Sequence, residues 1–117
     1  MLAMPGKVIL GLTETITIKG KSGKEIELTA RIDTGATSSS IGKHLAEELE
    51  LGPVIRTKVV KSASGVKQRP IVKATIIIKG KEIEEEVTIA DRSHMTYRVL
   101  IGQNILKKGN FLIDPNL

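Results

Sequence analysis

The chain has 117 residues, of which 40% are hydrophobic, and its formal net charge is +5. That length suffices for one domain with a buried core but not for two, so we expect a single domain over residues 1–117. The absence of cysteine excludes disulfides and thiolate metal sites, and with only two histidines a zinc site would need carboxylate ligands. Since one tyrosine and one phenylalanine are the only aromatic residues, base stacking with single-stranded nucleic acid is disfavoured. We therefore expect no metal, no cofactor and no nucleic-acid partner.

The first residues, "MLAMPGKVILGL", are apolar but are interrupted by Pro5, Gly6 and Lys7. They lack the charged segment and unbroken apolar core that mark a signal peptide. No apolar run approaches the length needed to cross a membrane. The sequence therefore predicts a cytoplasmic protein that does not associate with membranes.

Two alternating segments, residues 8–19 and 25–32, flank the glycine- and lysine-rich stretch "KGKSGKE". Alternation with period two on both sides of a turn predicts a β-hairpin. Because aromatic residues are scarce, the core must be aliphatic, and clustered β-branched residues favour strands. The second strand leads directly to Asp33, so a carboxylate is expected at the end of a buried strand.

A short helix is predicted over residues 42–51, "GKHLAEELEL". Ser40 is expected to cap its N-terminus, and Gly52-Pro53 to end it. Its buried face would consist of Leu45, Leu49 and Ala46.

A second hairpin is predicted from residues 54–62 and 66–78, joined by the turn "SASG". Lys79-Gly80 then turns the chain into a strand over residues 82–90. Four residues of this strand share one face by period two: Ile83, Glu85, Val87 and Ile89.

The C-terminal part contains a short apolar strand, "YRVLIG", which ends at Gly102. "QNILKK" predicts one or two helical turns closed by Gly109-Asn110, and "FLID" predicts a final strand. The chain is therefore expected to be a small, mostly antiparallel β protein with one or two short helices.

Positive charge is concentrated in the second hairpin. Residues 56–73 contain six cations and no acid: Arg56, Lys58, Lys61, Lys67, Arg69 and Lys73. Such a segment can steer an anionic partner, although solvated strand faces that keep the chain soluble explain it equally well.

Two distant segments together resemble the retroviral-type (retropepsin-like) aspartic proteases. An apolar strand runs into Asp33-Thr34-Gly35-Ala36, and a later one runs into "IGQNIL". Members of that family carry one Asp-Thr/Ser-Gly-Ala per subunit and, near the C-terminus, two apolar residues, a glycine and a short helix. The resemblance implies a small closed β-barrel with one or two short helices, and it places a flap at "KSASGVKQRP".

Five ordered segments extend the resemblance over nearly the whole chain: "GLTETITI", "IDTGATSSSI", "VKSASGVKQRP", "DRSHMTYRVLIGQNIL" and "FLIDP". They are similar to a cellular subfamily of retropepsin-like proteins. That subfamily is often labelled ATP-dependent zinc protease and is associated with glutamate-adding ATP-grasp ligases.

The resemblance implies that Asp33 is half of a catalytic dyad and that Thr34 and Gly35 support it. Two carboxylates facing each other cannot both ionise, so they share one proton; one activates water while the other donates to the scissile carbonyl. Gly102 would leave room for the aspartate loop beneath the following helix. A turn aspartate that binds its own backbone is the competing interpretation of Asp33.

Only half of a dyad is present, because neither Asp91 nor Asp114 precedes Thr/Ser-Gly. An active enzyme must therefore be a homodimer. Viral members commonly have a charged aspartate and arginine where this chain has Thr37 and Gln103, so the dimer contact at this position should differ.

A peptide or protein substrate is expected to contact Ala36, the flap and its base. The candidate substrate-binding residues are Ala36, Ser62, Ser64, Gly65 and Arg69. The basic hairpin, together with the association of the subfamily with glutamate-adding ligases, favours acidic or glutamate-rich peptides as substrates.

The roles of several other residues stay open at this point. Arg69, Arg92 and Arg98 suit either substrate carboxylates or structural contacts. Met95 is expected in the core, and His94 is expected to be packed or hydrogen-bonded rather than a metal ligand.

The sequence thus predicts a homodimeric aspartic endopeptidase. The alternative is a non-catalytic dimeric peptide-binding module that keeps the protease fold.

Overall fold

The alternating apolar segments form strands in the computed structural model, which describes residues 6–117 apart from the side chain of Ser62. The strands are β1 (Ile9–Leu10), β2 (Thr13–Lys19), β3 (Glu25–Ile32), β4 (Ser39–Gly42), β5 (Arg56–Ser62), β6 (Gly65–Ile78), β7 (Lys81–Ala90), β8 (Val99–Ile101) and β9 (Leu112–Ile113). The helices are α1 (Lys43–Glu48) and α2 (Gln103–Lys108).

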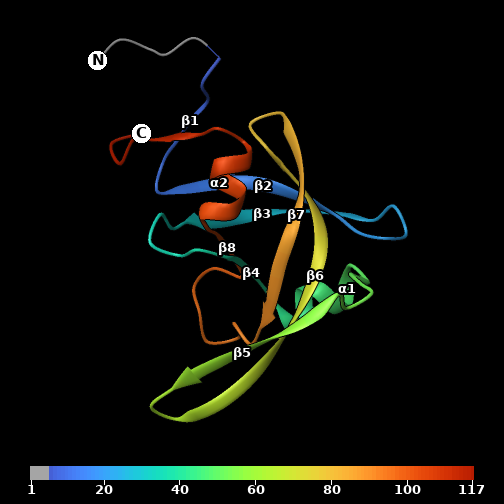
Figure 1. Ribbon diagram of the computed structural model, residues 1–117. Helices are drawn as coiled ribbons and strands as arrows, with labels where there is room; N and C mark the ends of the chain where they lie inside the picture. The colour runs from blue at the N-terminus through green and yellow to red at the C-terminus, as the bar shows by residue number, and fades with distance from the viewer. Residues whose placement is uncertain (1–5) are drawn as a thin grey trace.

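Six of these strands close into a barrel. The main sheet has the order β2-β3-β8-β4-β7-β6-β5. β2 also pairs with β6, and this pairing closes the six strands from β2 to β6 in that order into a barrel. β5 pairs with β6 alone, so the β5–β6 hairpin extends away from the barrel as the green arm at the bottom of Figure 1. The predicted closed, mostly β fold with two short helices is confirmed.

The core of the barrel is aliphatic, as the composition requires. On β6 the inward residues Val72, Ala74, Ile76 and Ile78 are buried, whereas Lys73 between them is exposed. Burying each large aliphatic side chain stabilises the fold by about 1.5–3 kcal/mol, so this alternation fixes which face of the strand points inward.

The predicted turns and the second helix are confirmed. Lys79 and Gly80 have φ angles of 49° and 80°, which is the backbone twist of a two-residue hairpin loop. α2 spans Gln103–Lys108, with Gly109 as its C-cap and Asn110 at a φ of 55°.

The prediction that Ser40 caps a helix was wrong. Ser40 lies in β4, a strand that the sequence did not indicate, and α1 begins after Gly42 without a side-chain cap. β4 pairs with β7 in parallel and with β8 in antiparallel fashion, and these long-range ladders hold the segment extended. α1 also ends at Glu48, before Gly52-Pro53. Its predicted buried residues are confirmed: Leu45, Ala46 and Leu49.

Met95 was predicted in the core but is 55% exposed. It lies in the loop between β7 and β8, where its N–H donates to the carbonyl of Arg92 at 3.0 Å. This turn directs the side chain outward.

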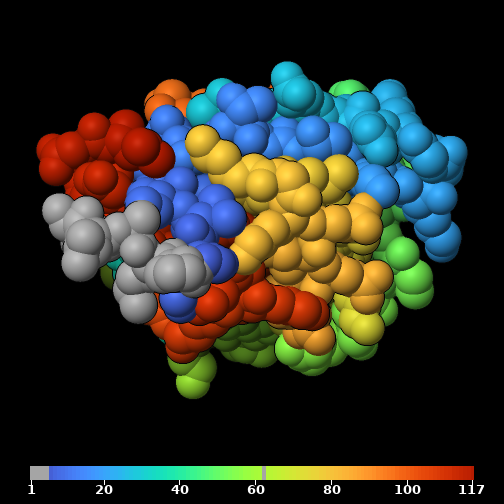
Figure 2. Space-filling model, turned by 90° about the horizontal axis from the view of Figure 1, so that it is seen from above, coloured from blue at the N-terminus to red at the C-terminus, as the bar shows by residue number. Residues whose placement is uncertain are grey.

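The two ends of the described chain meet. β1 and β9 form a separate parallel pair, and Figure 2 shows the red C-terminal residues at the surface beside the blue segment of β1 and β2. No helix within residues 6–117 is long and apolar enough to span a membrane.

Candidate active site

The two sequence motifs meet at the ends of two parallel strands. β3 pairs with β8 so that Ile32 lies opposite Ile101. The N–H of Asp33 then donates to the carbonyl of Ile101 at 2.8 Å. Parallel pairing therefore places Asp33 directly beside Gly102, although about seventy residues separate the two motifs in the chain.

The Asp33 loop, residues 33–38, orients its own carboxylate. The N–H of Gly35 donates to Oδ1 of Asp33 at 2.9 Å, and the N–H of Ala36 donates to the Asp33 carbonyl at 3.3 Å. Asp33 is half-buried, whereas Thr34 and Gly35 are exposed. A turn aspartate would make the same bond to Gly35, so the surrounding elements must distinguish the two interpretations.

α2 and Gly102 pack against the Asp33 loop and hold it in place. The N–H groups of Gln103 and Asn104 donate to the carbonyls of Ala36 and Thr37 at 2.7 and 3.3 Å. A Cβ at Gly102 would lie only 2.5 Å from the Ser38 carbonyl oxygen, so a side chain does not fit here. The expected role of Gly102, which is to let the loop and the helix approach, is confirmed.

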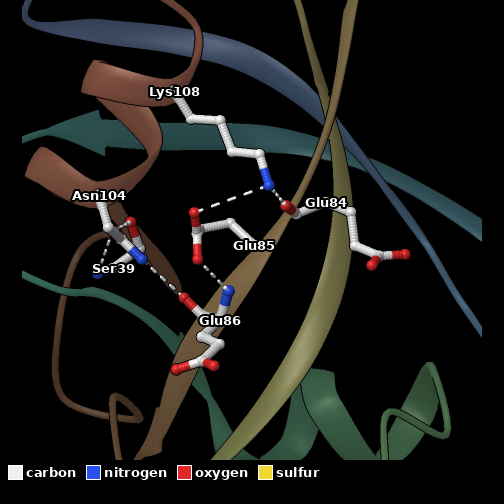
Figure 3. A network of polar contacts seen from close by, with 6 residues as sticks. All are labelled: Ser39, Glu84, Glu85, Glu86, Asn104 and Lys108. Carbon is white, nitrogen blue, oxygen red and sulfur yellow. Dashed lines mark hydrogen bonds and ion pairs between the residues drawn. The ribbon is translucent and has the colours of Figure 1, made fainter.

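A partly buried network of hydrogen bonds connects β4, β7 and α2, and sequence reasoning missed it. The hydroxyl of Ser39 donates to Oδ1 of Asn104 at 2.8 Å and accepts from the N–H of Gly102 at 2.8 Å. Nδ2 of Asn104 donates to the carbonyl of Glu86 at 2.8 Å, as Figure 3 shows. The serine run after Asp33 was the available signal, but its meaning depends on β4, which was not predicted.

The two positions that depart from the viral pattern carry no charge. Thr37 is exposed, and Nε2 of Gln103 donates to the carbonyl of Thr34 in the same chain at 2.8 Å. Gln103 therefore braces its own Asp33 loop.

A cavity of about 380 Å³ adjoins the Asp33 loop, and we call it the cationic cavity. Residues 35–38 form one wall, and the hairpin contributes Lys58, Val60 and Arg69. Arg92 lines it from the loop after β7. Ala36 and Arg69, two of the predicted substrate-binding residues, are thus brought together.

The three cations of this cavity lie close to one another. Lys58 and Arg69 are directly opposite across β5 and β6. Arg92 donates from Nε to the Tyr97 carbonyl at 2.9 Å and from Nη1 to the Ser40 hydroxyl at 3.2 Å. Burial, and then the charge of Arg69, lower the pKa of Arg92. Among the described residues no carboxylate forms an ion pair with any of the three cations.

The remaining predicted substrate-binding residues lie at the hairpin tip. Ser64 and Gly65 are exposed there and do not line the cationic cavity. The side chain of Ser62 lies outside the part of the chain that the structure describes.

His94, which was expected to be packed or hydrogen-bonded, is exposed and therefore not packed, and Arg98 is exposed as well. Within residues 6–117 no group of three or more His, Asp and Glu side chains could hold a metal ion. The residues present therefore do not fit a zinc site.

Comparison with solved structures finds this fold in proteins of low identity. Lpg0085, a Legionella pneumophila protein of unknown function, matches with a TM-score of 0.64 and 20% identity over 94% of each chain. Simian foamy virus protease matches with a TM-score of 0.61 and 23% identity, over 81% of this chain and 91% of that one. EIAV protease in complex with the inhibitor HBY-793 matches with a TM-score of 0.64 and 21% identity, over 85% of this chain and 88% of that one. No curated protein matches the chain.

A family model described as retropepsin-like aspartic endopeptidase RimB matches residues 42–117. The matched range contains the hairpin, Gly102 and α2, and it begins after the Asp33 loop. The chain belongs to the RimB-like family of retropepsin-like aspartic endopeptidases.

Proposed function

We propose that this chain is a homodimeric aspartic endopeptidase in which Asp33 of each copy supplies one catalytic carboxylate. One observation carries the proposal: a half-buried carboxylate, fixed by the Gly35 N–H, lies where β3, β8 and α2 meet. Family membership supports it. Thr34 and Gly35 form the rest of the catalytic loop in this proposal.

The chemistry needs two such loops. One ionised carboxylate takes a proton from water, and the protonated partner donates to the scissile carbonyl as the tetrahedral intermediate forms. Because one chain supplies a single Asp-Thr-Gly, the site is complete only when a second copy brings its Asp33 across a two-fold axis.

The substrate we propose is an acidic or glutamate-rich peptide. Lys58 and Arg69 face each other across the hairpin, and like charges directly opposite in a sheet are unfavourable unless an anion lies between them. A substrate carboxylate in the cationic cavity would relieve that repulsion. In this proposal the β5–β6 hairpin acts as the flap, and its tip carries Ser62, Ser64 and Gly65. Arg69, nearer the base of the hairpin, and Ala36 of the Asp33 loop contact the substrate in the cationic cavity.

A non-catalytic dimeric peptide-binding module is the second candidate. The hydrogen bond between Gly35 and Asp33 favours it as much as it favours catalysis, because a purely structural turn would keep it. The two candidates differ only in turnover.

Substitution of Asp33 tests the proposal. Asp33→Asn keeps the shape of the side chain but cannot act as a base, so cleavage of glutamate-rich peptides should fall about 100-fold or more. Asp91→Asn is the matched control, because Asp91 is also a turn aspartate, with Ser93 N–H donating to its Oδ1 at 3.0 Å. Cleavage that survives in Asp33→Asn would refute the proposal, and peptide binding without cleavage by the unmodified chain would favour the second candidate.

A further inference from the structure

Arg92 lines the cationic cavity with a guanidinium that residues outside the hairpin hold in place. Its Nε donates to the carbonyl of Tyr97 in the same loop, and its Nη1 donates to the hydroxyl of Ser40 on β4. Neither bond uses Nη2, which carries two further N–H donors. The side chain of Arg92 is thus fixed in position and can still bind an acceptor.

The acidic residue next to Arg92 in the chain does not neutralise it. Oδ1 of Asp91 accepts from the N–H and the hydroxyl of Ser93 at 3.0 and 2.7 Å, and Asp91 lines a different cavity beside α1. Among the described residues no carboxylate forms an ion pair with Arg92 or Arg69, although both are half-buried. Cations that are partly removed from water are costly unless they are paired, so the cavity favours an anion.

Arg69 reaches the same cavity from the hairpin. Burial, and then the charge of Arg69, lower the pKa of Arg92, so the two cations interact across the cavity. Guanidinium groups carry donors only, so these two side chains cannot bond to each other. A carboxylate accepts hydrogen bonds on both of its oxygens and is therefore the kind of group that can join them.

We infer that one substrate carboxylate binds Arg92 and Arg69 together, which makes Arg92 a specificity-determining residue. Arg92 fixes where the carboxylate lies, and Arg69 joins the hairpin to it. Ser40 is then a positioning residue that acts through Arg92. A single partly exposed pair contributes little, so the two arginines should act jointly rather than independently. This inference rests on the proposed function, since it requires a peptide bound beside the Asp33 loop.

A double-mutant cycle in the Asp33→Asn chain tests the inference without turnover. Fluorescence anisotropy would measure the affinity of a fluorescein-labelled glutamate-rich peptide and of its glutamine twin. Arg92→Gln and Arg69→Gln should each weaken binding of the glutamate-rich peptide about threefold. The double variant should also lose about threefold, whereas independent contacts would lose about ninefold. Binding of the glutamine twin should stay unchanged throughout, which a merely structural role of Arg92 does not predict.

Ser40→Ala is a second variant that keeps every charge but removes an acceptor from Arg92, and it should weaken binding of the glutamate-rich peptide alone. Arg98→Gln is the matched control, because Arg98 is exposed at the end of the same loop and does not line the cavity. It should change neither affinity.

Three results would overturn the inference: a ninefold loss in the double variant, an equal loss for the glutamine twin, or an equal loss from Arg98→Gln. No effect of Ser40→Ala would overturn the positioning role of Ser40. Failure of the chain with Asp33 intact to cleave any peptide would overturn the proposed function, while the binding cycle for Arg92 and Arg69 would stand on its own.

Discussion

The α carbon of Gly102 lies so close to Ser38 that a Cβ would come within 2.5 Å of the Ser38 carbonyl oxygen and 2.8 Å of the Ala36 carbonyl oxygen. Both neighbours are backbone atoms of the Asp33 loop, which is itself hydrogen-bonded to α2. Neither side can move without breaking those bonds. The close approach of Gly102 to Ser38 therefore couples the stability of the fold to the geometry of the candidate site.

Gly102→Ala should destabilise the protein by about 3 kcal/mol, because the added methyl group forces backbone apart. The control is Gly42→Ala, since Gly42 is also a helix N-cap but its Cβ would make only ordinary contacts, the nearest at 3.5 Å. Thermal unfolding followed by circular dichroism measures both. Similar melting temperatures for the two variants would show that the loop and α2 are not tightly packed.

Asn104→Asp should destabilise the protein by about 2 kcal/mol at neutral pH, because the Glu86 carbonyl loses its donor and faces a charge. Protonation lets the introduced carboxyl donate to that carbonyl, so its pKa is raised in the folded state. The loss should therefore shrink as the pH falls below that raised pKa and grow as the pH rises. Asn116→Asp, at an exposed position, is the control in urea unfolding at acidic and neutral pH. A loss independent of pH would contradict this account of the network.

The proposed dimer should tighten as salt is added. Each chain has a net charge of +5, so two copies repel, and neither Thr37 nor Gln103 supplies a charge to an ion pair at the axis. Added salt screens the repulsion. Sedimentation equilibrium at low and high salt measures the dissociation constant. A dimer that weakens with salt would indicate that ion pairs hold it, and a persistent monomer would refute the homodimeric model.

Local sequence signals predicted much of this fold. The alternation of apolar and polar residues located the hairpins, and "QNILKK" gave the exact bounds of α2. Both predictions succeeded because turn residues and the spacing of apolar residues are local features of the sequence. β4 escaped prediction because residues 39–42 are a strand only through their pairing with β7 and β8. The sequence "SSIG" has no alternation of its own that would indicate it.

The motifs of the candidate site were visible in the sequence, whereas its charge arrangement was not. Asp33 and Gly102 were identified from their flanking apolar strands. Arg69 was singled out among the six hairpin cations, but the sequence did not indicate that Arg56 is paired with Glu86 or that Lys58 lines the cationic cavity together with Arg69. Arg92 joins that cavity from a different segment. Such convergence depends on strand register, which composition does not specify.

Selectivity for acidic peptides should depend on Arg69 and on salt. A guanidinium can bind a carboxylate through two hydrogen bonds, and Arg69 lies in the cationic cavity opposite Lys58. Each partly exposed pair contributes about 0.2–1 kcal/mol, so cleavage of a glutamate-rich peptide should exceed that of its glutamine twin by several-fold at low salt and by less at high salt.

Arg69→Gln should reduce the preference for the glutamate-rich peptide, and Lys58→Gln in addition should nearly abolish it. Arg31→Gln is the control, because Arg31 is an exposed arginine of β3 that does not line this cavity. Initial rates for both peptides, measured for each variant at low and high salt, separate a local effect from net charge. If Arg31→Gln lowered the preference as much as Arg69→Gln, the cations would act only through the overall charge. If both peptides were cleaved equally at low salt, the proposed acidic substrate class would be wrong.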